Sequence, residues 1–308
     1  MDYIFIVISV FGFALQFMLM QIYEKQIRQN FATGIFLTMI TNAVGAVFFL
    51  IINGGKINIS SSAVWLAVML SVVMVGYNLL SLRALSLGNL AVYSMFMMLG
   101  GMALPVIYGV IFLREKLSVC QITGLFALTA FIVLQAVGAK QPDESKADEC
   151  GGEKQKKRTE YFLCCVAVFI VNGLTGVISK AHQVGQNAVD EKSFIVLSCG
   201  ITTLLSTLIF VVERAVRRKK EGIDGLKAML KAKPLGISAL LGIVTYGANY
   251  FLLLAARTVP ASAQFPIVSG GVIVLSALAS VLIFKDKLSK TETVAVVGSF
   301  VSTVLFAF

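Results

Sequence analysis

Residues 91–118 read AVYSMFMMLGGMALPVIYGVIFLREKLS, a long apolar run that ends in a short charged turn. The apolar part, 91–113, contains no Asp, Glu, Lys or Arg. About 20 apolar residues in a helix cross a hydrocarbon core of about 30 Å, so this run is long enough to span a membrane. It lacks the alternation of a membrane barrel strand, and a lipid-exposed span must satisfy its own backbone hydrogen bonds. The run therefore predicts a transmembrane helix.

Similar apolar runs fill most of the 308-residue chain. The ten predicted spans are 3–22, 32–52, 63–82, 91–113, 119–139, 161–179, 194–212, 235–256, 261–284 and 293–308. The composition agrees, because 57% of the residues are hydrophobic and 14% are charged, against about 25% charged in soluble proteins. We expect an all-α polytopic membrane protein with ten transmembrane helices. The first span lacks a basic leader and a cleavage site, so we expect a helix and not a cleaved signal peptide.

The charged turn occurs twice in the chain. Arg114–Ser118 (REKLS) matches Lys285–Ser289 (KDKLS) at an offset of 171 with the same order of charges, and Asn78 matches Asn249 at the same offset. Each copy holds five predicted spans, an odd number, so the second copy must cross the membrane in the opposite sense. The sequence thus predicts two inverted five-helix repeats. Their boundaries are 1–139 for the first repeat, 140–160 for a polar basic linker, and 161–308 for the second repeat.

Basic residues are distributed unevenly among the predicted connections. The linker, the loop 214–234 and the connections after spans one, three and nine hold 20 of the 26 Lys and Arg residues. Short cytoplasmic loops carry an excess of basic residues, so these connections are predicted to lie on the cytoplasmic side of the cell membrane and both termini on its outer side. The loop 214–234 is expected to be solvated; a basic amphipathic helix on an anionic leaflet is the alternative. Lipid headgroups explain the net charge of +10, and no nucleic acid partner is expected.

Ionisable residues are absent from the middle of every predicted span. A charge at the bilayer centre is costly and usually marks proton or ion coupling. Facilitated diffusion or exchange is therefore favoured over antiport that uses a membrane-embedded carboxylate. His182, the single histidine, follows Lys180 and is expected to be a solvated loop residue and not a pH switch.

Neutral hydrogen-bonding side chains do lie within the predicted spans. Tyr246, Asn249 and Tyr250 are spaced i, i+3 and i+4, so they share one face of a helix, and the third span carries a similar face. Such a face can bind a small polar or zwitterionic solute, or it can tie helices together with about 0.6–2 kcal/mol per contact. Asn42 is assigned to helix pairing. The candidate substrate contacts are Gln16, Tyr77, Asn78, Tyr93, Asn172, Tyr246, Asn249, Tyr250 and Gln264.

Glycine and proline interrupt corresponding spans of the two halves. Interrupted spans at matching positions point to the binding site and hinge of a transporter, because freed backbone can line a cavity; ordinary close packing is the alternative. The candidate hinge or cavity residues are Gly100, Gly101, Pro105, Pro266, Gly270 and Gly271. In the last span, Gly298 and Ser302 have small-xxx-small spacing, which is compatible with a homodimer face.

Several activities lack their sequence signatures. The five cysteines have no metal-ligand spacing, the glycine pairs are not followed by the Lys-Ser/Thr of a phosphate loop, and the single histidine offers no catalytic triad. We therefore expect no enzyme activity, no metal and no cofactor.

The two five-span halves, the turns LREKLS at 113–118 and FKDKLS at 284–289, and the span endings Arg83-Ala84-Leu85 and Leu254-Ala255-Ala256 resemble the drug/metabolite transporter superfamily, EamA type. The resemblance covers nearly the whole chain. It implies a central cavity lined by spans 1, 3, 4, 6, 8 and 9, and transport of amino acids, other small metabolites or drugs. Relatives usually place both termini in the cytoplasm, which is the opposite of the orientation that the charge distribution predicts.

We therefore expect a membrane carrier that moves a small organic metabolite, an amino acid or a similar polar or zwitterionic solute, by alternating access and without a membrane-embedded proton-coupling carboxylate. Two alternatives stay open. One is a proton-driven exporter of drugs or metabolites, and the other is a membrane scaffold that transports nothing.

Overall fold

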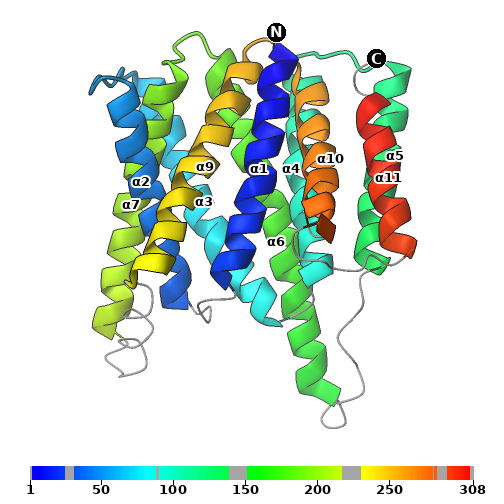
Figure 1. Cartoon of the computed structure of the whole chain (residues 1–308), viewed down its shortest axis with the longest axis horizontal. Helices are drawn as coiled ribbons and strands as arrows, with labels where there is room; N and C mark the ends of the chain where they lie inside the picture. Colours follow the sequence, from blue (N-terminus) through cyan, green and yellow to red (C-terminus); the bar gives the residue numbers. More distant parts are fainter. Residues whose placement is uncertain are drawn as a thin grey trace. The chain divides into compact units, whose positions relative to one another are not determined.

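The computed structural model describes residues 2–24, 31–87, 90–138, 151–216, 230–279, 281–282 and 290–305. These residues form ten α-helices and no strand. In chain order the helices are α1 (Asp2–Glu24), α2 (Phe31–Ile52), α3 (Ser61–Leu87), α4 (Leu90–Phe112), α5 (Val119–Gly138), α6 (Gly151–Val184), α7 (Glu191–Val216), α9 (Ala232–Ala256), α10 (Ala261–Ala279) and α11 (Lys290–Leu305) (Figure 1).

The helices have the length and the composition of membrane spans. Seven of those described, α1, α2, α3, α6, α7, α9 and α10, contain an apolar window that is long enough to cross a bilayer. The other three contain shorter apolar stretches, at Phe96–Phe112, Val119–Leu134 and Thr293–Leu305. The predicted all-α class is confirmed, and the chain has the architecture of an integral, polytopic membrane protein.

One helix extends well beyond its predicted span. α6 begins at Gly151 and ends at Val184, whereas hydropathy placed the span at 161–179. Its first turns are rich in Glu, Lys, Gln and Arg, which are strong helix formers although they are too polar to lie in lipid. Part of the predicted linker is therefore helical. The rest of the linker, most of the basic loop 214–234 and the second charged turn, 285–289, lie outside the described residues.

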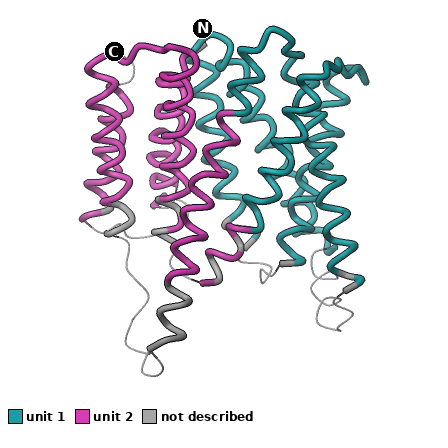
Figure 2. The backbone as a smooth tube through the Cα atoms, turned by 180° about the vertical axis from the view of Figure 1, so that it is seen from behind, with its two compact units in different colours: residues 1–79, 178–259 teal, residues 80–177, 260–308 magenta. Residues whose placement is uncertain are grey.

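The chain forms two compact units, and each unit combines helices from both halves of the sequence. Unit 1 contains residues 1–79 and 178–259, and unit 2 contains residues 80–177 and 260–308 (Figure 2). In unit 1, α2 packs along α7 and α1 packs along α9. In unit 2, α5 packs along α11 and α4 packs along α10 (Figure 1).

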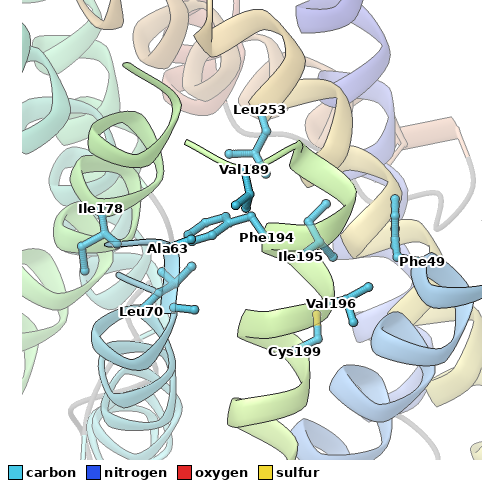
Figure 3. Close-up of a cluster of buried hydrophobic side chains, with 11 residues drawn as sticks. Phe49, Ala63, Leu70, Ile178, Val189, Phe194, Ile195, Val196, Cys199 and Leu253 are labelled. Carbon is cyan, nitrogen blue, oxygen red and sulfur yellow. The ribbon is translucent and has the colours of Figure 1, made fainter. Parts of the chain in front are cut away.

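Each unit buries its own apolar side chains. One cluster in unit 1 contains Phe194 of α7 together with Phe49, Leu70, Val189 and Leu253 from other elements (Figure 3). The corresponding cluster in unit 2 comprises Met102, Leu128, Ile132 and Ile273. Large apolar side chains are also exposed on several helices, as expected of surfaces that contact lipid.

The glycine pair of α4 lies at a close helix crossing. A Cβ at Gly100 would overlap the backbone carbonyl of Phe169 in α6, and a Cβ at Gly173 would overlap Leu104 of α4. Only residues without a side chain let two helix backbones approach so closely. In α10, Gly270 similarly faces Thr303 of α11. Pro105 and Pro266 lie inside α4 and α10.

The small residues of the last span also pack within unit 2. A Cβ at Gly298 would overlap the ring of Phe131 in α5, and Ser299 and Ser302 are buried. The face of α11 that is exposed carries Val297 and Val301 instead. The small-xxx-small spacing therefore contributes to packing within the chain, and dimerisation stays a prediction.

The crossing of α4 and α6 can be tested with Gly100→Ala. Overpacking of this kind costs about 1–3 kcal/mol, so the Tm of the purified protein should fall. Gly76→Ala is the matched control, because nothing lies within 4 Å of a Cβ there, and helix propensity should favour it by up to about 1 kcal/mol. Equal Tm values for the two variants would contradict the close crossing.

Candidate functional site

The candidate substrate contacts divide between the two units. Unit 1 contains those of α1, α3 and α9, namely Gln16, Tyr77, Asn78, Tyr246, Asn249 and Tyr250. Unit 2 contains those of α4, α6 and α10, namely Tyr93, Asn172 and Gln264.

Tyr246 joins two helices of unit 1. Its hydroxyl donates a hydrogen bond to Oδ1 of Asn42 in α2, and a Cβ at Gly45 of α2 would overlap its ring. The tyrosine thus lies where α2 and α9 approach closely. Asn42 pairs helices, as the sequence suggested, and Tyr246 is its partner in that contact.

Tyr250 lies one turn later on the same helix and packs against aromatic side chains. Its ring centroid is 5.5 Å from that of Phe49 in α2 and 5.6 Å from that of Phe251. The side chain is half-buried. The two tyrosines of the predicted face therefore both contact α2.

The two asparagines at matching positions of the predicted repeats make the same local hydrogen bond. Nδ2 of Asn78 donates to the carbonyl of Met74 at 3.0 Å, and Nδ2 of Asn249 donates to the carbonyl of Thr245 at 2.8 Å. Each bond reaches back four residues along its own helix. Both side chains are half-buried, and the structure gives neither Oδ1 a hydrogen-bond donor among the described residues. Each asparagine thus presents a carbonyl oxygen in a largely apolar helix.

Gln16 of α1 offers a further oxygen close to the same part of α9. Its Oε1 is buried and has no hydrogen-bond partner within the described part of the chain. The helix contacts fix its level: one turn earlier, a Cβ at Gly12 would lie 2.7 Å from Cβ of Ala248, and one turn later Leu19 packs with Leu241. Gln16 therefore lies alongside the α9 turn that carries Thr245 and leads to Asn249.

The candidates of unit 2 are engaged in helix contacts. Nδ2 of Asn172 in α6 donates to the carbonyl of Met97 in α4 at 2.7 Å, next to Gly101. The hydroxyl of Tyr93 donates to Sδ of Met97 at 3.7 Å. Gln264 is fully buried near the start of α10. Asn172 thus ties α6 to α4 at their close crossing.

Sequence analysis missed a buried lysine at one end of unit 1. Lys180 is 3% exposed, and its Nζ donates to the carbonyls of Ala256 and Val259, at 2.7 Å each. These carbonyls belong to the end of α9, where the helix leaves acceptors unsatisfied and a cation is favourable. Nearby, Arg257 forms an ion pair with the buried Glu191. Lys180, Glu191 and Arg257 lie at the ends of predicted spans, and nothing in the sequence around them indicates these partners.

The prediction that His182 is a solvated loop residue is wrong. The side chain is 1% exposed, and its ring stacks on Phe194 with a centroid distance of 3.8 Å. Its Nδ1 lies 2.8 Å from Nε2 of Gln183. The reason for the error is that α6 continues to Val184, so His182 shares a helical face with the buried Ile178 and does not lie in a loop.

The first charged turn holds the start of a distant helix. The carboxylate of Glu115 accepts hydrogen bonds from the backbone N–H groups of Ala261 and Ser262, at 2.8 and 2.9 Å. These groups lie at the N-terminus of α10, where an anion is stabilised. The repeated charge pattern had marked this turn, but not its partner. Asp286, the corresponding residue of the second turn, lies outside the described residues.

A carboxylate outside the spans caps α7. Oδ2 of Asp190 accepts from the backbone N–H of Ser193 at 3.0 Å, and Oδ1 accepts from Nδ2 of Asn58 at 2.7 Å. Burial tends to raise the pKa of Asp190, but the hydrogen bonds from Ser193 and Asn58 together hold it below its ordinary value of 3.8. In the part of the chain that the structure describes, no group of three His, Cys, Asp or Glu side chains could hold a metal ion.

Comparison with known proteins supports the fold. No family model and no curated protein matches the chain. A protein of known crystal structure superposes with a TM-score of 0.68 at 15% sequence identity, over 99% of this chain and 95% of that one. At that identity the likeness shows the fold alone. The resemblance to the drug/metabolite transporter superfamily therefore stays a prediction.

Substitutions can separate helix pairing from substrate binding. Tyr246→Phe leaves Oδ1 of Asn42 without its donor, so we expect a loss of about 0.6–2 kcal/mol in the free energy of unfolding. Asn249→Leu removes a bond within one helix and should change stability much less. Thermal unfolding in one detergent compares them. A larger loss for Asn249→Leu would contradict this division of roles.

The Asp190 cap makes a pH-dependent contribution to stability. Because its pKa is lowered in the folded protein, the contribution is present above pH 3.8 and is lost as the pH falls through the folded-state pKa. The Tm of the wild type should therefore fall more steeply below about pH 4 than that of Asp190→Asn. Parallel Tm profiles for the two proteins over this range would argue against the cap.

Proposed function

We propose that this protein is a membrane carrier, built from two inverted five-helix repeats, that moves a small polar organic solute by alternating access. The observation that carries the proposal is the pair Asn78 and Asn249. They lie 171 residues apart at matching positions of the two halves, in the same conformation, each with a carbonyl oxygen that no described residue binds.

The helix pairings support the inverted repeat. In chain order, α2 and α7 are the second and seventh helices, α4 and α10 the fourth and ninth, and α5 and α11 the fifth and tenth. Each of these pairs is in contact, and each joins helices that are five places apart. Repeats related by a two-fold axis in the membrane plane bring elements near that axis against their own counterparts.

The surroundings of the two asparagines also match. Each follows a glycine by two residues, Gly76 before Asn78 and Gly247 before Asn249. A Cβ at either glycine would meet nothing within 4 Å. The two segments, 171 residues apart, share a glycine two residues before the asparagine and open space beside that glycine. Both features support a common origin of α3 and α9.

The need to solvate their side-chain oxygens links Asn78 and Asn249 to transport. An amide oxygen without a donor is costly in hydrocarbon, so a half-buried oxygen in a membrane helix must meet water or a polar ligand. A residue that only ties helices together has its oxygen occupied, as in Asn42. Asn78 and Asn249 are therefore suited to contact a solute or the water that accompanies it.

The charges of the described spans favour transport that is not driven by a membrane-embedded acid. Glu191 lies at the first residue of α7 and is paired with Arg257, and Glu160 pairs with Arg83. Neither carboxylate lies at the centre of a span. We also propose that the basic loops face the cytoplasm and that both termini lie on the outer side of the cell membrane. The reason is that 20 of the 26 basic residues lie in the connections on one side.

Transport can be measured in proteoliposomes with a panel of amino acids and related metabolites. We expect saturable uptake by the wild type that does not respond to an imposed pH gradient. Asn78→Leu and Asn249→Leu should each reduce uptake about tenfold, which corresponds to the loss of one hydrogen bond of about 1.4 kcal/mol to the solute.

Gly247→Ala is the control, since it places a methyl group in open space two residues from Asn249. It should retain uptake, and thermal unfolding should show that all three variants are folded. No uptake of any solute class would favour a scaffold instead of a carrier. Uptake driven by a pH gradient would favour a proton-coupled exporter.

A further inference from the structure

We infer that the proposed carrier recognises its solute through the solute's own hydrogen-bond donors, which makes amines and ammonium compounds its substrate class. The inference rests on the proposed function and adds the chemistry that the site selects. It follows from which atoms of the amide side chains are already bound to the protein.

The orientation of each asparagine amide is fixed by its partner. In unit 1, Asn42, Asn78 and Asn249 all donate to the carbonyl four residues earlier, at 2.7, 3.0 and 2.8 Å. A backbone carbonyl can only accept, so the nitrogen of each amide must face it. One N–H of each amide is therefore held by the helix. A second N–H remains, but the atom of Asn78 and Asn249 that has no partner among the described residues is the oxygen, which is only an acceptor.

Asn42 shows what such an oxygen binds. Its Oδ1 accepts a hydrogen bond from the hydroxyl of Tyr246. Asn78 and Asn249 have the same backbone bond, but none of the described residues donates to their oxygens. The missing partner must be a donor, and a solute that carries N–H or O–H groups supplies one. A carboxylate or phosphate oxygen would be repelled at the same position.

Two further amides in the described helices have the same requirement. Oε1 of Gln16 is buried without a donor, beside the α9 turn that leads to Asn249. In unit 2, Asn172 uses Nδ2 to bind the carbonyl of Met97, which again leaves its oxygen as the group on offer. Gln16 and Asn172 thus each offer an acceptor oxygen within their own unit.

Three basic residues at the ends of the described spans are already engaged with the protein. Lys180 is bound to the carbonyls of Ala256 and Val259, and Arg257 is paired with Glu191. Arg83 is paired with Glu160 through Nε at 2.8 Å. The described spans therefore present oxygen acceptors, whereas these three basic groups bind other protein groups. An ammonium group gains strong, charge-assisted bonds from such acceptors.

The inference can be tested with matched triplets of solutes in the proteoliposome assay. Each triplet contains an amino acid, the amine that lacks its carboxylate, and the acid that lacks its ammonium group. Leucine, isopentylamine and 4-methylpentanoate form one set, and phenylalanine, 2-phenylethylamine and 3-phenylpropanoate form another. Each compound is tested as a competitor of the uptake measured in that assay, and protein-free liposomes give the background. We expect the amino acid and the amine to compete at least tenfold better than the acid.

Variants then connect this preference to the acceptor oxygens. Asn249→Leu should lower the amine-to-acid ratio about tenfold, whereas Asn42→Leu removes an oxygen that is already occupied and should change stability but not the ratio. If Asn249→Leu does not fold, Asn78→Leu tests the same point at the matching position.

The possible outcomes distinguish a failure of the amine preference from a failure of the carrier proposal. Uptake in which the acid competes as well as the amine would overturn the inference and leave the carrier proposal in place. A ratio that is unchanged in both asparagine variants would also overturn it. The absence of uptake for every solute would remove the proposed function and the inference together.

Discussion

In hydrocarbon, no water can satisfy a polar group, so each one must find a partner within the chain. The helices meet this condition for the backbone, and many hydroxyl side chains of the described spans follow the same rule. Ser71 donates to the carbonyls of Ala67 and Ser198, at 2.7 and 3.0 Å, and so binds its own helix and α7. Thr202 donates to the carbonyl of Ser198 at 2.7 Å. These hydroxyls show how polar side chains of the described spans meet this constraint.

The charged side chains obey it at the ends of helices. Lys180 binds the carbonyls at the end of α9, and Glu115 binds the N–H groups at the start of α10, so each of these helix ends is held by a group of complementary charge. Against this background, the oxygens of Asn78 and Asn249 are exceptions. Exceptions to a strict solvation rule are costly, and function is a physical reason for them to persist.

Local patterns predicted the helices, because hydropathy and span length depend only on neighbouring residues. They also predicted a repeat, since the charged turn occurs twice with the same order of charges. The partners of polar residues could not be predicted, because they are distant in sequence: Tyr246 and Asn42 are 204 residues apart, and Glu115 and Ala261 are 146 apart. Asn42 and Asn249 make the same bond within their helices, and only tertiary structure shows which oxygen is occupied.

The account depends on two halves that cross the membrane in opposite directions, and sided labelling tests this most directly. Lys116→Cys and Lys287→Cys, at matching positions 171 residues apart, would be made in a background in which the five native cysteines are replaced. An impermeant thiol reagent should modify the Lys116→Cys protein in intact cells and the Lys287→Cys protein only after permeabilisation. Modification of both variants from the same side would contradict the inverted repeat, and with it the carrier proposed here.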